Sequence, residues 1–449
     1  MSEQEIKDRI AQFQIWRRET QIFNDYVAGI QKLQYSSTEY KNKFGLRLRE
    51  LVDNICGTVV NAPASRLEVI NFAPESGNQE LSQRAWAIWS NSKMPGLQKE
   101  LYREAVLNGA AYLIVWRDAK NNTRIWPQKS PDILLFRDDD GRTLEADKLW
   151  FDASSRRYYL TRYFADRIEK YQSERQIKTA EVLSLETLRF IPREVEGESF
   201  PLMNPYGAVP VFELEMPARR SLLADVIPLQ DVINKHLSDL MVAGEYNSLR
   251  QRWATGIEFE VDPKTGKAVI PFGYNDQLWA SSSETGRFGE FSNTLLSDYL
   301  NALTDARNEI ARITGIPLHW FNLTSGQFPS GEALRNAESR FIAVLSELQL
   351  RFGAELSEMI AFALQVEMES TAPIDEQFAV QWQSAAPVSE QEMLSNALIK
   401  KQLGVSAQRL LEELGYTQSD IEAILIQKAE EERTQAEASA RFFNAGMIQ

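Results

Sequence analysis

The stretch that decides the fold is SLLADVIPLQDVINKHLSDLMVAGEYNSLRQRWATG, residues 221–256. Its apolar residues recur at spacings of three and four, which predicts a helix that runs to about Asn247. Pro228 lies near the first turn of this helix, where its missing N–H costs little. The helix leads into an insert of β type, residues 250–291, in which GIEFEV and AVIPF flank a turn at 262–267.

A second helix is predicted after the insert, over about 293–314, and Gly315-Ile316-Pro317 ends it. A loop at 315–330 then precedes one long helix from 331 to about Met368, roughly 55 Å at 1.5 Å per residue. A compact enzyme would rarely place its longest helix after an isolated helix–β–helix excursion. This order is typical of an elongated subunit that stacks beside copies of itself.

The segments on either side complete an α+β pattern. Residues 1–115 read mainly as helices, and residues 112–215 as a β-rich segment of short apolar runs separated by polar turns. A strand at 378–382, FAVQW, leads to an acidic helical tail at 389–449, in which Gly404 and Gly415 are predicted to end helices. Helical spacing in the first segment is seen at Leu48, Leu51, Ile55 and Val59, and again at Leu97, Leu101 and Ala105.

The charge balance argues against a protein that grips nucleic acid. The chain has 49 basic and 63 acidic residues, a formal net charge of −14. Tight contacts to phosphate come from Lys and Arg, so a DNA-gripping protein should be basic. A conduit that lets DNA slide is compatible with an acidic wall, which repels phosphate. No membrane association is expected, because no stretch approaches 18 uninterrupted apolar residues and the charged N-terminus lacks the apolar core of a signal peptide.

The residue inventory offers little chemistry. Cys56 is the only cysteine, which excludes an intrachain disulfide and a cysteine-based zinc cluster. His236 and His319 are far apart and lack partners at metal-ligand spacing, so a structural role is expected for both. The phosphate-binding, nucleophile-elbow and zinc-protease motifs are absent. Asp138-Asp139-Asp140 is read as an acidic hairpin turn before Gly141 rather than as a Mg²⁺ cluster. We therefore expect no catalytic residues, no metal and no cofactor.

Four segments, taken in order, resemble the portal proteins of tailed double-stranded-DNA bacteriophages. The first fits the helix-to-strand entry of the portal wing, and the second the turn and strand before the stem. The third is similar to the first stem helix, and the fourth to the stretch from the second stem helix through the tunnel loop into the long wing helix. The four segments are, in that order, REAVLNGAAYLIVWRD at 103–118, NPYGAVPVFEL at 204–214, residues 221–256 as quoted above, and ARITGIPLHWFNLTSGQFPSGEALRNAESRF at 311–341.

The resemblance implies an α+β fold: an elongated portal fold with a mixed α/β wing, a two-helix stem, a small β-containing clip, a long wing helix and a helical C-terminal crown. The implied divisions are the wing at 1–220, stem helix 1 at 221–249, the clip at 250–291, stem helix 2 at 292–314, the tunnel loop at 315–330, the long wing helix and strand at 331–388, and the crown at 389–449.

The resemblance also implies a non-enzymatic function. Such subunits form a ring, usually of twelve, at one capsid vertex, where the ring is the channel for genome packaging and ejection. The implied partners are double-stranded DNA passing without sequence preference, the terminase large subunit, the major capsid and scaffolding proteins, and a head–tail adaptor. The implied location is the virion, after assembly in the host cytoplasm.

Three sets of residues are candidates for these contacts. The loop set is neutral and polar and is expected to face the channel, because such groups touch a DNA backbone without strong ion pairing; the alternative is an ordinary surface connector. The basic set would make weak phosphate contacts or intersubunit ion pairs; the alternative is solvated helix charge. The aromatic set would anchor clip interfaces; the alternative for its tryptophans is the core. The loop set comprises Asn322, Thr324, Ser325, Gln327 and Phe328. The basic set comprises Lys235, Arg250 and Arg252. The aromatic set comprises Trp253, Phe259, Phe272 and Trp279.

Two other classes of protein remain as alternatives. Another head–tail connector or minor capsid protein would generally be shorter and would lack the helix–β–helix excursion. A metal-dependent nucleic-acid enzyme would need several carboxylates to converge on one metal ion. The sequence does not distinguish the host, the tail type, the ring size, the oligomeric state before assembly, or which clip or crown residues contact which partner.

Overall fold

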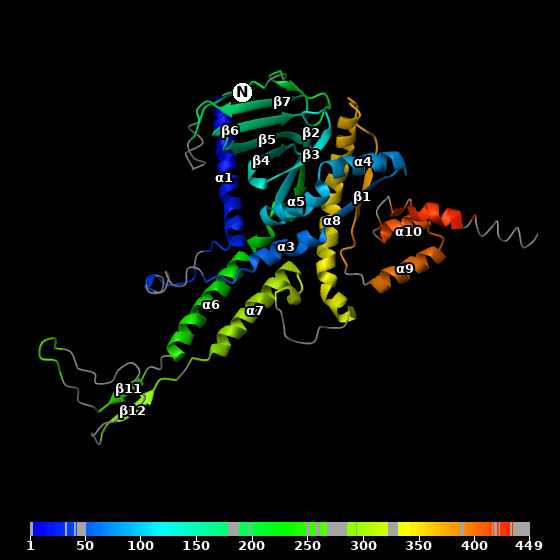
Figure 1. The fold of residues 1–449 in the computed structure, drawn as a ribbon. Coiled ribbons are helices and arrows are strands. Elements are labelled where there is room, and N and C mark those ends of the chain that lie inside the picture. The colour runs from blue at the N-terminus through cyan, green and yellow to red at the C-terminus, as the bar shows by residue number, and fades with distance from the viewer. Residues whose placement is uncertain are drawn as a thin grey trace, which may run out of the picture. The chain divides into compact units, whose positions relative to one another are not determined.

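The chain folds into two compact units, Met1–Gln383 and Ser384–Gln449, as seen in a computed structural model (Figure 1). The structure describes residues 3–31, 34–39, 42, 51–177, 188–195, 197, 199–248, 252–256, 261–266, 285–292, 294–321, 331–386, 390–414, 416, 420, 421, 423–431 and 433. The fold mixes helices and sheets, as the sequence predicts.

A three-stranded antiparallel sheet lies at the centre of the first unit. Its middle strand, β2 (Ala110–Arg117), pairs with β10 (Val211–Glu215) and with β3 (Thr123–Gln128). The first six residues of β2 are all buried, which requires cover on both faces of the sheet. Helices α5 (Met94–Asn108) and α8 (Gly331–Glu367) pack against β2, and Ala110, Tyr112 and Ile114 share a core with residues of the neighbouring sheet.

A second antiparallel sheet has six strands, and helix α1 (Glu3–Val27) covers it. Strand order is β4, β5, β6, β7, β8, with β9 paired to β7. Ile6, Ile10 and Phe13 of α1 share a buried cluster with Leu149 and Leu160 of the sheet. The turn before Gly141 joins β4 to β5, as predicted. The strands are β4 (Ile133–Arg137), β5 (Thr143–Asp152), β6 (Arg157–Phe164), β7 (Arg167–Ser173), β8 (Phe190–Pro192) and β9 (Leu202–Met203).

The region predicted to be mainly helical contains a strand. β1 (Val69–Pro74) lies between helices α3 (Cys56–Arg66) and α4 (Gln79–Asn91), and it pairs antiparallel with β13 (Phe378–Trp382). The prediction missed β1 because its partner lies about 300 residues further along the chain. The helix expected to include Leu51 and Ile55 begins only at Cys56, after an irregular segment at 51–55.

The helices on either side of the insert follow the predicted order. They are α6 (Ile227–Ser248) and α7 (Leu296–Thr314), and α8 is the long helix predicted from 331. In the insert, the described strands are β11 (Arg252–Thr255) and β12 (Arg287–Glu290), which were not predicted. Most of the predicted strands GIEFEV and AVIPF lies outside the described residues. The short 3₁₀ turns are η1 (Ser130–Asp132), η3 (Pro217–Arg219), η4 (Leu222–Ala224) and η5 (Leu318–Trp320).

The second unit is helical where it is described. It contains α9 (Glu390–Gln402) and α10 (Ala407–Glu413), and Gly404, with φ of +91°, follows α9 as the predicted helix stop. Ala385, Leu410 and Ile421 are its buried apolar side chains among the described residues. Within the described part of the chain, no helix combines the length and apolarity needed to span a bilayer.

Candidate channel helices and subunit contacts

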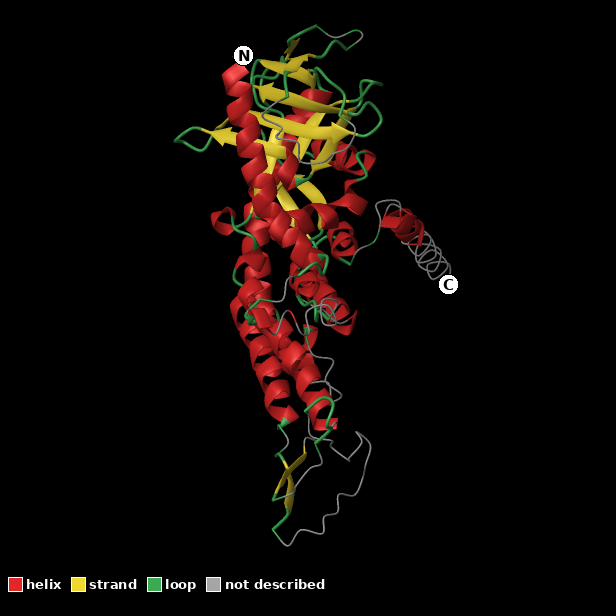
Figure 2. Ribbon diagram, turned by 90° about the vertical axis from the view of Figure 1, so that its left-hand side faces the viewer, coloured by secondary structure: helices red, strands yellow, loops and turns green. Residues whose placement is uncertain are grey.

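Helices α6 and α7 form an antiparallel pair (Figures 1 and 2). Near the insert, Asn247 and Thr294 exchange two hydrogen bonds: Asn247 Nδ2 donates to Thr294 O at 2.8 Å, and Thr294 N donates to Asn247 Oδ1 at 3.2 Å. Further along, the rings of His236 and Tyr299 lie 6.4 Å apart. These contacts place the start of α7 beside the end of α6, so the pair carries the insert at one end.

The other end of α6 is held by a buried network of amide and carboxyl groups, here called the polar joint. Gln230, fully buried, lies at its centre. Its Oε1 accepts from the Ile55 N–H at 3.0 Å, and its Nε2 donates to Asp53 O at 2.7 Å and to Asn234 Oδ1 at 3.0 Å. Asn234 Nδ2 donates in turn to Gln31 Oε1 at 2.6 Å. Because these groups are largely removed from water, their geometry fixes α6 against the segment before α3.

The polar joint also ties in α1 and α7. The Tyr26 hydroxyl of α1 donates to Asp231 Oδ1 at 2.7 Å, and burial raises the pKa of both side chains. Arg307 of α7 pairs with the Asp53 carboxylate. Sequence reasoning missed this cluster. The available signal was a run of polar residues on one face of the predicted helix, where an apolar stripe would be expected to face the core.

The distal halves of α6 and α7 are held far less tightly. In residues 239–248 and 296–302, all of which are described, no side chain is buried. Several large apolar side chains in and next to these segments are instead exposed: Met241 52%, Tyr246 43%, Leu295 66% and Leu300 53%. Several large apolar side chains exposed on one pair of helices are typical of an interaction site.

Charge on the two helices is predominantly negative. Their sequences contain three Lys and Arg residues against six Asp and Glu residues. Each base is paired with an acid: Lys235 with Asp239, Arg312 with Glu309, and Arg307 with Asp53 as described above. The paired bases leave little free positive charge on these helices for phosphate.

The hairpin at the end of the helix pair is built around a tryptophan. Trp253 of β11 lies opposite Gly289 of β12, and its indole packs so closely on that glycine that a Cβ there would overlap the ring. Trp253 is 37% exposed, and Phe288 and Phe291 beside it are 38% and 62% exposed. The isolated hairpin therefore exposes an aromatic surface.

A buried carboxylate lies where α8 begins to pack. Glu338, 2% exposed, has its Oε1 3.5 Å from Arg66 Nη2 and 3.4 Å from His319 Nε2. The Arg66 guanidinium also lies 5.8 Å from the Trp320 ring. These contacts connect η5, which lies in the first part of the predicted tunnel loop at 315–330, to α3 and α8.

The structure places only some of the predicted contact residues. Trp253 lies in the exposed hairpin, and Lys235 is engaged by Asp239 within its own helix. The backbone of Arg252 lies in β11, but its side chain is not among those described. The remaining candidates lie outside the described residues: Asn322, Thr324, Ser325, Gln327, Phe328, Arg250, Phe259, Phe272 and Trp279. Their roles stay predictions.

Among the described residues, no group of three or more His, Cys, Asp or Glu side chains is arranged to hold a metal ion. Asp138 caps the β4–β5 turn, its Oδ1 accepting from the backbone N–H groups of Asp140 and Arg142. Burial raises the pKa of Cys56 to about 12, which keeps the thiol protonated and unreactive.

Comparison with known proteins gives two curated relatives of similar sequence, both named portal protein. The chain is 23% identical over 327 residues to that of Mycobacterium phage L5 and 24% identical over 316 residues to that of Mycobacterium phage D29. These matches cover 70% and 66% of this chain, but only 65% and 61% of the relatives. The chain thus spans less than two thirds of the length of either relative.

A solved structure, the neck of an empty gene transfer agent particle, matches at a TM-score of 0.45 and 12% identity, over 85% of this chain and 95% of the other. The family model for the phage portal protein, SPP1 Gp6-like, matches residues 5–437. Since that match covers nearly the whole chain of 449 residues, the chain belongs to the SPP1 Gp6-like family of phage portal proteins.

Proposed function

We propose that this chain is the ring subunit of a portal at one vertex of a phage-like particle, a structural protein whose channel is lined by α6 and α7. Family membership supports a head–tail connector role. The observation that carries the channel assignment is the exposed apolar surface of the distal α6–α7 pair. An isolated pair leaves this surface in water, whereas neighbouring subunits packed side by side would bury it.

The charge pattern of the helix pair supports passage rather than retention of DNA. With Lys235, Arg307 and Arg312 each engaged by a carboxylate, a channel of these helices presents few free cations to the phosphate backbone. Net affinity for DNA then stays low and the duplex can slide. The proposed partners are double-stranded DNA, a terminase large subunit, major capsid and scaffolding proteins and a head–tail adaptor, in a ring of about twelve subunits.

The first experiment compares ring formation by wild-type protein and two matched variants. Leu300 and Leu144 are 53% and 56% exposed, but Leu144 lies on β5, away from the helix pair. Burying a leucine fully is worth about 1.5–3 kcal/mol, so a half-exposed leucine placed in a contact contributes about 1 kcal/mol, and a buried aspartate there adds a further penalty. Leu300→Asp should therefore shift rings toward monomers, whereas Leu144→Asp should not.

Negative-stain class averages and mass photometry give the readout. Rings with a central channel in wild type and in Leu144→Asp, but not in Leu300→Asp, are the expected result. Equal ring populations in the two variants would remove α6–α7 from the subunit contact. A wild-type protein that stays monomeric across the concentration range, and in the presence of capsid and scaffolding proteins, would contradict the ring itself.

The predicted loop residues are proposed to face the channel. Support comes from the described anchors on either side of these residues, where His319 and Trp320 precede Asn322 and Glu338 follows Phe328 on α8. Gln327→Lys would place a cation against the DNA backbone and should slow packaging, with Gln327→Asn as the matched neutral control. DNA filling at the wild-type rate in Gln327→Lys would contradict this placement.

A further inference from the structure

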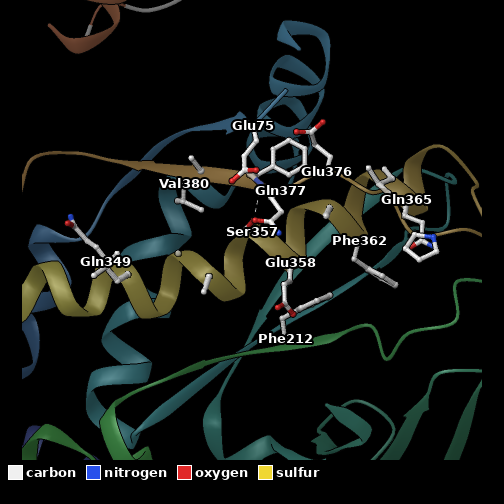
Figure 3. Close-up of a pocket in the computed structure, with 18 of the residues that line it drawn as sticks. Glu75, Phe212, Gln349, Ser357, Glu358, Phe362, Gln365, Glu376, Gln377 and Val380 are labelled. Carbon is white, nitrogen blue, oxygen red and sulfur yellow. Dashed lines mark hydrogen bonds between the residues drawn. The ribbon is translucent and has the colours of Figure 1, made fainter. Parts of the chain in front are cut away.

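A groove of about 1020 Å³ runs along α8, and none of its lining residues belongs to α6 or α7 (Figure 3). Its lining residues on α8 extend from Ser346 to Gln365, a length of roughly 28 Å at 1.5 Å per residue. Strand β13 and the preceding residues Pro373, Ile374, Glu376 and Gln377 border one side, and Phe212 of β10 borders the other. The groove thus has one helix as its floor and a strand on each side.

The floor of the groove is apolar and shallow. Leu350 is 77% exposed on it, and Gly353, Ala354 and Ala361 keep it low. A large apolar side chain that is so fully exposed on an otherwise well-packed helix is stabilised when a binding partner buries it.

The shape of the groove favours a helix over an added strand. The backbone N–H of Phe378, on the β13 edge that faces α8, already donates to Ser357 Oγ at 3.0 Å. Gly353 lies against Trp382, since a Cβ on it would stand 3.4 Å from the indole Nε1. An extended chain therefore has no room between β13 and α8. A helix laid over small residues of α8 can approach closely, as in ordinary helix–helix packing.

The rim of the groove is negatively charged. Glu75 and Glu376 lie on the β1–β13 side, and Glu358 on the opposite side, as Figure 3 shows. Among its described lining residues there is no Lys, Arg or His. Glu376 accepts from the Ser76 backbone N–H at 3.0 Å, which holds the pKa of its carboxyl below the ordinary value and keeps it ionised. Glu75 and Glu358 have no ion-pair partner among the described side chains.

We propose that this groove binds a basic amphipathic helix of a partner protein. Apolar side chains of that helix pack on Leu350, Ala354 and Ala361. Lys and Arg side chains on its two flanks pair with Glu75 and Glu376 on one side and with Glu358 on the other. The site lies outside the proposed channel and does not depend on the channel assignment, so it adds a protein-docking surface to the proposed function.

The test measures binding of labelled synthetic peptides to the full-length protein by fluorescence anisotropy. The probe is an 18-residue helical peptide with Leu at spacings of three and four and Lys on both flanks. A peptide of the same composition in shuffled order, which has no apolar face, controls for attraction to a protein of net charge −14. The amphipathic peptide should bind at least about tenfold more tightly than the shuffled one, a difference of about 1.4 kcal/mol.

Two variants in the groove and one control outside it locate the binding. The double variant Glu75→Gln/Glu358→Gln should lower the affinity for the amphipathic peptide about tenfold. The control Asp139→Asn/Asp140→Asn, which removes the same charge from the β4–β5 turn, should leave that affinity unchanged. Ala354→Trp fills the exposed floor and should abolish binding.

Three results would overturn the proposal. Equal losses in the two double variants would reduce the binding to general attraction. Unchanged affinity in Ala354→Trp would place the peptide elsewhere. If Ala354→Trp instead alters the oligomeric state measured by mass photometry, the occupant is a second copy of this chain. Ring formation by all variants, scored in parallel, separates failure of this site from failure of the proposed channel.

Discussion

Replacing Gln230 by alanine removes the side chain at the centre of the polar joint. The truncation leaves four groups without this partner: the Ile55 N–H, the Cys56 thiol, the Asp53 carbonyl and the Asn234 amide oxygen. Each buried group left unsatisfied costs about 1–3 kcal/mol, and water entering the new cavity relieves part of that cost. We expect a loss of about 3–5 kcal/mol, a large fraction of the 5–15 kcal/mol typical of a domain.

Native-state hydrogen exchange is the suitable assay, because a chain of two compact units need not unfold in a single transition. The Ile55 amide reports the change directly, since Gln230 accepts its hydrogen bond. A local loss of about 3 kcal/mol corresponds to exchange about 100-fold faster. Gln21→Ala is the control, because the Gln21 side chain is exposed and its one hydrogen bond among the described residues is to Asp25 in its own helix. If Ile55 exchange rises less than tenfold in Gln230→Ala, the polar joint does not fix α6 as argued.

The remaining predictions concern a buried acid and a tight hairpin. Burial raises the pKa of Glu355 from an ordinary value of 4.5 to about 7, so its ionisation favours the unfolded chain as pH rises from about 4.5 through 7. Glu355→Gln keeps the acceptor for the Glu213 backbone N–H, and it should stabilise the protein by about 2–3 kcal/mol at pH 8 but not at pH 4.5. If thermal unfolding of the two proteins differs by the same amount at both pH values, ionisation of Glu355 is not the cause of the difference. Gly289→Ala should displace Trp253 and speed amide exchange in the β11–β12 hairpin, whereas Gly244→Ala on α6, where an added Cβ meets nothing within 4 Å, should leave it unchanged. Unaltered amide exchange of the hairpin in Gly289→Ala would show that the packing of the Trp253 indole does not depend on a glycine at position 289.

The predictable part of the fold is that in which neighbouring residues determine the outcome. The spacing of apolar residues located α6, α7 and α8, because a helix face repeats every three to four residues. Turn chemistry located Gly141 and Gly404, whose positive φ angles are +83° and +91°. Both signals are contained in a short window of the chain.

The candidate site was predictable only in part. The order of helix, insert and helix pointed to the paired helices, and family resemblance pointed to the same place. The polar joint was missed because Gln230 and Asn234 read as ordinary helix polarity until Gln31 and the backbone at 53–55 are brought against them. In the hairpin, Trp253 was predicted as an interface residue, but strands β11 and β12 and the exposed Phe288 were not, since short β runs without their partners give a weak signal.

The sequence by itself determined the helices, the β-rich segment, the negative charge and the family, because each depends on local pattern or on residue order. Only the tertiary structure decided that β1 pairs with β13 across about 300 residues. It also decided which polar residues are buried together and where Leu350 and three glutamates form a groove. Those features depend on contacts between segments far apart in the chain, and no local pattern encodes such contacts.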